Sequence, residues 1–250
     1  HIFLSLLVLV LSIIIFSSIN QQPSPEGSQT LLLGKAVFSD NKTPPSKSDN
    51  WVDISLPDDW FRQTEINKNK WYHFELPLSA LPEKDWALYI TNTTNPVSLY
   101  INDRLFFAPE QHISETARVW GQPQLIKINP DLLSQQFLLS SKPGNSHLEN
   151  KVSQRLSFDI LLPKNQNASG MLGPIYIGPE SVLLAGYKQA YFIKVYLVRF
   201  LVFAMVLSSF FVGMLWLFRR RDTVYVFFSI AVIIWAVFSY SHIPIKLPFS

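Results

Sequence analysis

The 250-residue chain contains no cysteine. This absence excludes disulfide bonds, thiolate nucleophiles and zinc sites built from thiolates. The sequence also has no serine-hydrolase elbow, phosphate-binding loop or dinucleotide-binding glycine loop. His73, His112 and His147 each lack a second histidine at metal-ligand spacing. We therefore expect no catalytic residues, no metal site and no cofactor in these 250 residues.

Charged residues are also scarce. They make up only 16% of the chain, whereas 48% of its residues are apolar. This ratio is unusual for a soluble protein, and it is an average over a polar region and nearly uncharged runs. The net charge of +3 comes partly from one arginine cluster, and no basic stripe carries interleaved aromatic residues. The composition therefore gives no case for a nucleic-acid partner.

Three apolar runs indicate a membrane protein. Residues 1–19 are expected to form an N-terminal anchor or signal segment. Residues 195–218 and 223–243 are each predicted to form a membrane-spanning helix, since a core of about 30 Å needs about 20 residues. We expect residues 244–250 to be a truncated extracytoplasmic end.

One cationic cluster predicts the topology. Arg219, Arg220 and Arg221 lie between the two predicted spans, in a short loop at residues 219–222. Basic residues in short loops are retained in the cytoplasm. Residues 20–194 are therefore expected to lie outside the cytoplasm.

The extracytoplasmic part has the pattern of an all-β sandwich. Its segments between residues 51 and 179 are short, rich in aromatic and β-branched residues, and separated by Pro, Asn, Asp and Gly. Residues 20–50 are assigned as a tether and first strand region. The predicted strands are Lys70–Leu76, Trp86–Ile90, Val97–Ile101, Leu105–Phe107, Gln124–Ile128, Arg155–Leu162 and Ile175–Ile177.

Several segments carry a resemblance to known families. The quoted segments are Ile54–Trp60, Trp71–Phe74, Trp86–Ile90, Val97–Arg104, Trp120–Pro123 and Gly170–Gly178. The first four resemble galactose-binding-like jelly rolls, such as the sugar-binding domains that precede β-galactosidase barrels. Together with the following spans, the set is similar to the periplasmic sensor region of bacterial seven-transmembrane receptors with diverse intracellular signalling modules. This chain departs from that pattern at Asp103, where glycine is usual, and it contains only two of the seven receptor helices.

The resemblance implies a mainly β, galactose-binding-like jelly roll followed by transmembrane α-helices. It also implies a multi-pass protein of the bacterial inner membrane, with residues 20–194 in the periplasm or outside the cell. The parent protein would be a sensor histidine kinase or diguanylate cyclase. The expected partners are membrane lipid, a small-molecule or carbohydrate ligand, and a second copy of the chain in a homodimer.

Five residues near predicted turns are candidates for ligand binding. Aromatic rings stack on sugars while polar side chains bond the hydroxyl groups. Trp71 and Trp86 are instead assigned to the core. The alternative for the polar candidates is that they only form a hairpin turn. The candidates are Trp60, Trp120, Asn102, Asp103 and Arg104.

The junction at residues 180–194 carries a second candidate function. Aromatic and cationic residues gather at the approach to the first predicted span, where membrane anchoring is the simplest interpretation. The alternative is that this collar couples movement of the sandwich to the helix, since little linker follows Pro179. The residues are Tyr187, Tyr191, Lys194, Tyr196 and Arg199.

These features predict a receptor fragment that senses a ligand or partner outside the cytoplasm and passes a conformational bias inward. A membrane-tethered carbohydrate-binding or adhesion module without signalling is the main alternative. A membrane-assembly component of a transport system is a third.

Overall fold

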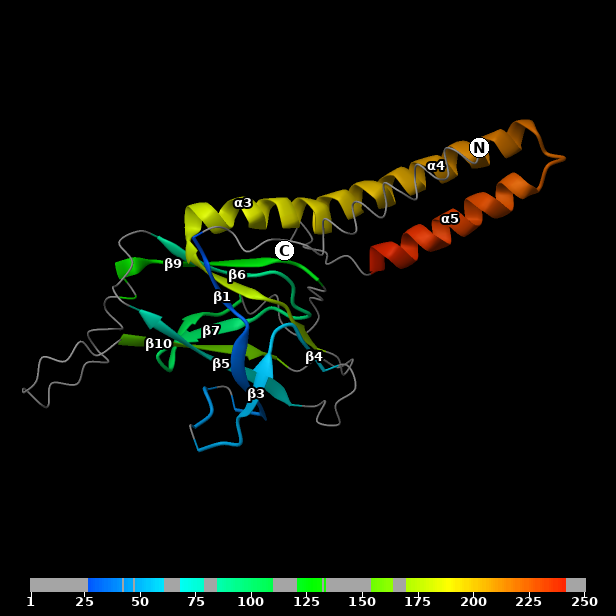
Figure 1. Cartoon of the computed structure of the whole chain (residues 1–250). Helices are drawn as coiled ribbons and strands as arrows, with labels where there is room; N and C mark the ends of the chain where they lie inside the picture. The colour runs from blue at the N-terminus through cyan, green and yellow to red at the C-terminus, as the bar shows by residue number, and fades with distance from the viewer. Residues whose placement is uncertain are drawn as a thin grey trace, which may run out of the picture.

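The chain folds into a β-sandwich that continues into a long helix and a second antiparallel helix (Figure 1). The computed structural model describes residues 27–41, 43–46, 48–60, 68–78, 85–109, 121–131, 133, 154–163 and 170–241. The predicted N-terminal apolar segment, Trp120 and residues 244–250 lie outside this part of the chain.

Two antiparallel sheets form the sandwich. The larger has six strands, in the order β3-β2-β5-β10-β7-β8, and the smaller has four, in the order β1-β12-β6-β9. The strands of the larger sheet are β3 (Val52–Ser55), β2 (Leu33–Ser39), β5 (Asn69–Leu78), β10 (Gln154–Leu162), β7 (Ser98–Ile101) and β8 (Arg104–Phe107). Those of the smaller are β1 (Gln29–Leu31), β12 (Ile175–Pro179), β6 (Trp86–Ile90) and β9 (Gln124–Ile128). A short pair, β4 (Asp58–Asp59) with β11 (Met171–Leu172), is separate.

Strand periodicity divides the side chains between the core and the outer faces. In β5, Tyr72 and Phe74 lie in the main core between the sheets, whereas Trp71 and His73 have the opposite parity. In β6, Leu88 belongs to the main core. Its neighbour Ala87 belongs to a second apolar cluster on the other face of the small sheet.

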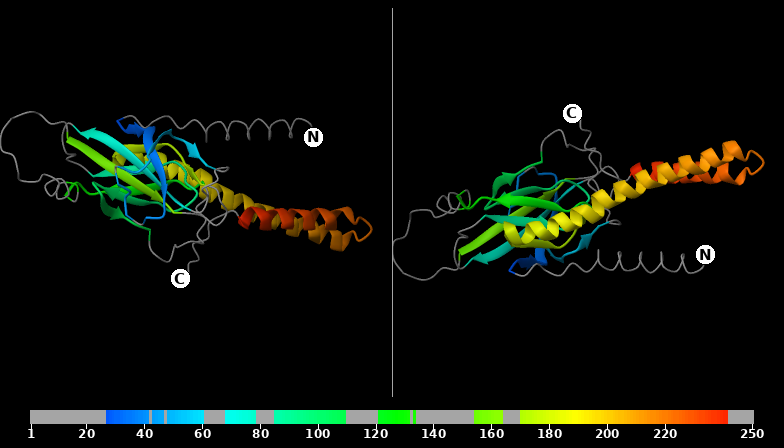
Figure 2. Two further views of the ribbon diagram at one scale, coloured as in Figure 1. Left: turned by 90° about the horizontal axis from the view of Figure 1, so that it is seen from below. Right: turned by 90° about the horizontal axis from the view of Figure 1, so that it is seen from above.

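A helix covers that outer face of the four-stranded sheet. Helix α3 (Glu180–Tyr191) begins directly after β12 and lies across the small sheet in Figures 1 and 2. Its residues Leu183 and Ala190 are buried against Tyr89 and Tyr176 of the sheet. The small sheet is therefore buried on both faces, which accounts for the nearly continuous apolar sequences of β6 and β12.

The helix then runs on without a break and leaves the sandwich. A π-helical segment, η2 (Phe192–Leu197), connects α3 to α4 (Val198–Phe218). After a tight turn, α5 (Val224–Ser241) packs back along α4. The two form a hairpin that projects away from the sheets (Figure 2).

The small residues of the hairpin allow close helix contact. The Ser209 hydroxyl donates a 2.7 Å hydrogen bond to the Ser229 carbonyl oxygen. A Cβ atom on Gly213 would lie 3.5 Å from the Ser229 hydroxyl oxygen. Small residues at such contacts are typical of helices that pack in membranes.

The prediction of a mainly β sandwich is confirmed by these sheets. Strands β6 and β9 have the predicted bounds, and the other five predicted strands are present with small shifts at their ends. Strands β1 and β2, which lie in the region assigned as a tether and first strand (residues 20–50), belong to the sheets of the sandwich. These strands are hard to find from sequence, since Leu33 is 80% exposed and Val52 in the edge strand β3 is 64% exposed.

Trp60 lies in the core of the sandwich, where only 8% of its surface is exposed. Its ring contacts Phe38 and Tyr72, with centroids 6.5 and 6.1 Å away. Gly170 lies so close to the indole that an added Cβ atom would overlap it. Trp86, in contrast, is only partly buried at the border of the core.

We expect Trp60→Ala to lower the free energy of unfolding by about 3–5 kcal/mol, because it removes a buried ring and leaves a cavity. Gly170→Ala should also destabilise the sandwich, by about 1–3 kcal/mol, because the ring must shift. Trp86→Ala should cost less than Trp60→Ala. Denaturant unfolding of the purified chain, followed by near-ultraviolet circular dichroism, checks this ranking. Equal losses for Trp60 and Trp86 would contradict it.

Candidate ligand site

A row of ionisable residues crosses the outer face of the six-stranded sheet. Strand pairing places Asp53 of β3 opposite Lys35 of β2, Lys35 opposite His73 of β5, and His73 opposite Asp159 of β10. Directly opposed residues in a sheet have neighbouring side chains. The fold thus places polar groups from four strands on the outer face of the large sheet, on the side of the sandwich away from α3.

His73 and Asp159 form the centre of this row. The Nδ1 atom of His73 donates to Oδ1 of Asp159 over 2.6 Å, and Glu75 Oε1 lies 3.7 Å from Nε2. The hydrogen bond with Asp159 raises the pKa of the His73 imidazole above its ordinary value, against the lowering effect of partial burial. Asp159 is only 2% exposed, and its Oδ2 atom has no hydrogen-bond partner among the described residues.

An aromatic ring stands beside this pair. The Trp51 ring centroid lies 5.7 Å from that of His73, at an angle of 58°. The indole N–H donates to the Ser46 carbonyl oxygen over 3.0 Å, and the Trp51 backbone N–H donates to the Asp49 carbonyl oxygen over 2.8 Å. The loop therefore fixes the ring before any ligand arrives.

The row and the ring border a cavity of about 580 Å³. This volume is in the range of small-molecule sites. The lining combines the ionisable residues with a few apolar ones and one residue of the predicted hairpin, Asp103. The lining residues are Leu33, Gly34, Lys35, Pro45, Trp51, Asp53, Ile54, His73, Glu75, Asp103 and Asp159.

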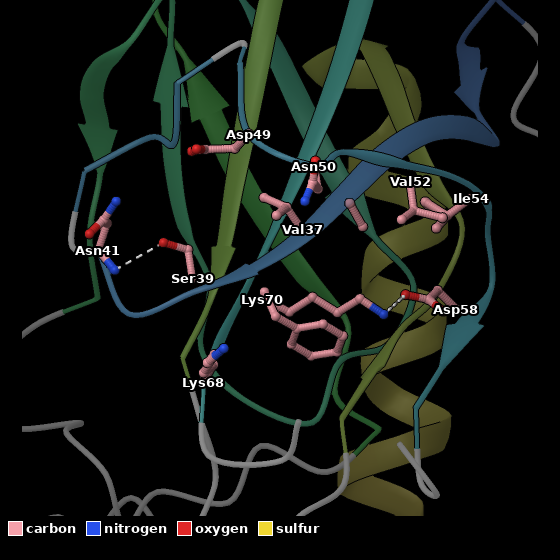
Figure 3. Close-up of a pocket in the computed structure, with 12 residues that line it drawn as sticks. Val37, Ser39, Asn41, Asp49, Asn50, Val52, Ile54, Asp58, Lys68 and Lys70 are labelled. Carbon is pink, nitrogen blue, oxygen red and sulfur yellow. Dashed lines mark hydrogen bonds and ion pairs between the residues drawn. The ribbon is translucent and has the colours of Figure 1, made fainter. Parts of the chain in front are cut away.

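A second cavity of about 540 Å³ lies beside β2 and β3 (Figure 3). Its main feature is the buried Lys70, whose Nζ lies 2.7 Å from Oδ2 of Asp58. The Tyr72 hydroxyl donates to the same oxygen over 2.9 Å, and burial, with the Asp58 charge, raises the Tyr72 pKa well above its ordinary value. Lys70 Nζ also lies 4.6 Å from the Trp60 ring centroid. The ammonium group is thus already paired and enclosed by rings, so this cluster stabilises the core rather than receiving a ligand.

The predicted ligand residues are not gathered into one site. Trp60 is a core residue, which corrects its assignment as a ligand-binding residue near a predicted turn, and its ring faces are occupied by Phe38 and Tyr72. Trp71 is fully buried as expected, but it packs against Tyr100 on the outer face.

The predicted hairpin is present, and its residues have different environments. Asn102 and Asp103 have φ values of 49° and 63°, the left-handed geometry that this turn requires. The Asn102 carboxamide oxygen accepts hydrogen bonds from the Ser157 N–H and hydroxyl, so it holds the turn against β10. Asp103 borders the 580 Å³ cavity, and Arg104 is exposed in β8.

Sequence reasoning missed Trp51 and treated His73 only as a possible metal ligand. The signal was present in the alternation of β5, which places Trp71, His73 and Glu75 on one face. The partner Asp159 was not accessible to this reasoning, because β5 and β10 are 86 residues apart at the His73–Asp159 pair.

The junction residues lie along α3, η2 and the start of α4. The Tyr187 ring centroid is 6.2 Å from that of Tyr89 in the sheet, and Tyr191 and Tyr196 continue the chain of ring contacts. Lys194 is turned toward the sandwich, where its Nζ donates to the Thr91 carbonyl oxygen over 3.0 Å. Arg199 is exposed on α4 and borders a cleft between the two long helices. Arg219–Arg221 form the exposed turn between α4 and α5.

No protein-family model and no curated protein matches the chain. Solved structures with partial similarity include a β-glucuronidase from Ruminococcus gnavus, at 13% identity and a TM-score of 0.38, over 64% of this chain and 30% of the other. A glycosyl hydrolase family 2 member from Bacteroides cellulosilyticus has 14% identity and a TM-score of 0.40, over 60% and 20%. The β-glucuronidase of an uncultured Clostridium has 9% identity and a TM-score of 0.37, over 64% and 30%. The chain thus spans less than a third of these proteins, and scores this low assign it neither a family nor an activity.

We expect the His73 imidazole to titrate above its ordinary pKa of about 6.5. Its contribution to stability is complete below that value and is lost as the pH rises through the higher folded pKa. Asp159→Asn should move the pKa of His73 downward, because the charged acceptor is gone. Nuclear magnetic resonance of labelled histidine, assigned with His73→Gln, measures this. A midpoint at or below about 6.5 in the wild type would refute the expected direction.

Proposed function

We propose that the chain is part of a membrane-bound signal-transduction receptor. Its extracytoplasmic β-sandwich senses a ligand or partner and relays this state through the helices to a cytoplasmic output module. The motif resemblance suggests a bacterial seven-transmembrane receptor with a histidine kinase or diguanylate cyclase output. The observation that carries this proposal is the double attachment of the α3–η2 helix to the sandwich.

The first attachment lies at the start of α3. Strand β12 ends at Pro179 and the helix begins at Glu180, so no linker separates them. The Glu180 N–H donates to the Asp85 carbonyl oxygen over 2.9 Å, and its Oε1 lies 2.7 Å from Nζ of Lys127 in β9. The start of the helix is therefore attached to β12 and β9 of the small sheet and to the residue that precedes β6.

The second attachment lies at the other end of β6. Lys194 bonds the carbonyl oxygen of Thr91, which directly follows β6. The Thr91 hydroxyl and N–H both donate to the Pro174 carbonyl oxygen, just before β12. Between Glu180 and Lys194 the helix rises about 21 Å at about 1.5 Å per residue. A movement of the small sheet is thus expected to carry the helix with it.

Lys194 lies within η2, where π-helical hydrogen bonding makes the helix locally irregular. Segments with π-helical bonding are rare and frequently occur at functional sites. In this chain the segment lies where the helix leaves the sandwich, and its Val195 is buried. We propose that η2 is the point at which sandwich and membrane helix can change their relative twist.

The surfaces of α4 and α5 support a membrane location for these helices. By length and composition, one described helix, Glu180–Phe218, is able to cross a membrane, and a shorter apolar helix spans Val224–Ser239. Large apolar side chains such as Phe203, Phe211 and Trp235 are each about 60% exposed. Surfaces of this kind are unusual in contact with water. Lipid is the partner proposed for them.

A tethered carbohydrate-binding or adhesion module remains the alternative function. Such a module needs only attachment, and a flexible tether suffices for it. The rigid junction therefore favours the receptor. The sequence that follows Ser250 in the gene separates the two, since a receptor requires further spans and an output domain.

We expect the sandwich to be extracytoplasmic and the α4–α5 turn to be cytoplasmic. Single cysteines at Asp131 and Asp222, introduced into the cysteine-free chain, test this orientation in spheroplasts of the expression host with a membrane-impermeant thiol reagent. The cysteine at position 131 should react in intact spheroplasts, and that at 222 only after the membrane is permeabilised. The reverse pattern would show that the orientation is wrong.

We expect Lys194→Met to loosen the junction. A hydrogen bond to a charged group contributes about 1.5–3 kcal/mol, which corresponds to roughly ten- to hundred-fold faster local exchange. Hydrogen–deuterium exchange over residues 183–197, measured on the chain in nanodiscs, reports this change. Lys188→Met is the matched control, because Lys188 is exposed on the same helix. Equal exchange in both variants would remove the second attachment from the proposal.

A further inference from the structure

The 580 Å³ cavity on the six-stranded sheet has a negative lining. Four carboxylates, from Asp53, Glu75, Asp103 and Asp159, face one lysine and one histidine. The lining is therefore net negative whether or not the imidazole is protonated. Opposite charge attracts, so this lining favours a cationic ligand and disfavours an anionic one.

A second observation is independent of this charge. The Asp159 side chain is 3% exposed at the border of the cavity, and within the described part of the chain only one of its two oxygens has a hydrogen-bond partner. A buried carboxylate oxygen without a donor costs free energy, which a ligand N–H group would recover. Since His73 already bonds Oδ1, Oδ2 is the buried oxygen of Asp159 that lacks a donor among the described residues.

The third observation is the fixed aromatic ring. Trp51 is partly exposed and held by Ser46, beside His73 and the acidic row. A tryptophan face attracts cations, and the combination of aromatic rings with carboxylates is typical of sites for organic ammonium groups. The described residues contain no group of three or more histidines and acids placed to hold a metal ion.

We propose that this cavity binds a small organic ligand through an ammonium group, with Asp159 and Asp53 as acceptors and Trp51 as the stacking surface. The ammonium N–H groups bond to the carboxylates, and the carbon skeleton of the ligand lies against the ring. This inference names the ligand class of the proposed sensor and depends on that function only for its biological meaning.

The same geometry makes binding depend on pH. A protonated His73 neutralises Asp159 and repels an ammonium group, so raising the pH through the pKa of His73 should tighten binding. The other charged groups that face His73 are Lys35 on β2, Asp53 on β3 and Glu75 on its own strand, with Asp103 from the hairpin. Lys35 lies opposite Asp53 and His73 in the strand pairing, so its ammonium group is expected to compete with the ligand.

The test uses the whole chain in phosphatidylcholine nanodiscs, which carry no net lipid charge. Isothermal titration calorimetry compares glucosamine, putrescine and benzylamine with their uncharged counterparts glucose, 1,4-butanediol and benzyl alcohol. At least one amine should bind more tightly than its counterpart. Asp159→Asn and Asp53→Asn should weaken that binding by about tenfold or more, and Trp51→Leu should weaken it as well.

Two further variants should behave differently: one should strengthen amine binding, and the other should leave it unchanged. Lys35→Met should strengthen amine binding severalfold, because it removes a competing cation. Asp131→Asn is the matched control, since this exposed carboxylate lies beyond β9 and should have no effect. Affinity for putrescine should rise from about pH 5.5 to about pH 8, on either side of the ordinary histidine pKa, and His73→Gln should abolish this rise.

Three outcomes would overturn the proposal. They are equal binding of the amines and their uncharged counterparts, binding that is unchanged in both Asp53→Asn and Asp159→Asn, and weaker binding in Lys35→Met. Asp53 is exposed, so its variant remains informative even where Asp159→Asn disturbs folding. Failure here leaves the labelling and exchange results for the helices unaffected, so the two proposals are tested separately.

Discussion

The contact between α3 and the outer face of the four-stranded sheet determines the arrangement of the rest of the protein. Tyr89 and Tyr176 lie on this face of the sheet, and Leu183 and Ala190 of α3 complete their burial. Because the helix runs on through η2 into α4, its docking also sets the direction in which the apolar hairpin leaves the domain. The direction in which α4 leaves the domain is thus fixed by ordinary core packing.

The two outer faces of the sandwich therefore have different roles. The small sheet uses its outer face for the helix, so its strands have apolar residues at successive positions. The outer face of the large sheet carries Lys35, His73 and Asp159. From Tyr72 to Leu76, β5 therefore alternates between core and polar residues. A ligand on the large sheet is therefore separated from α3 by the whole thickness of the core.

Sequence reasoning predicted the features that depend on local pattern. The short aromatic strands, the Asn102–Asp103 hairpin and the apolar character of α4 all follow from periodicity and turn chemistry within a few residues. It failed for Trp60, because a tryptophan beside Pro57 and two aspartates has the local sequence of a loop end. Its burial depends on Gly170, which is far away in the chain.

Sequence reasoning missed the candidate site for the same reason. Four strands contribute to the charged row, and strand order in an antiparallel sandwich is not encoded by any one segment. His73 and Asp159 become neighbours only because β10 inserts between β5 and β7. Lys194 is similar, since its partner Thr91 precedes it by 103 residues. A sequence could suggest lipid headgroups for this lysine, but only the folded chain could offer it a carbonyl oxygen.

Under the proposed receptor function, the separation of the cavity from the helix limits how a signal could pass between them. Direct contact is excluded by the core, which contains Phe74 and Phe158 of the large sheet packed toward Leu88 and Ile177 of the small one. Close-packed interiors transmit displacement because they have little free volume. A ligand that draws β3 toward β10 would therefore change the curvature of the large sheet and shift the small sheet as a unit. The two attachments of α3–η2, at Glu180 and Lys194, would then convert that shift into a rotation of α4, provided the ligand binds one of the two states more tightly.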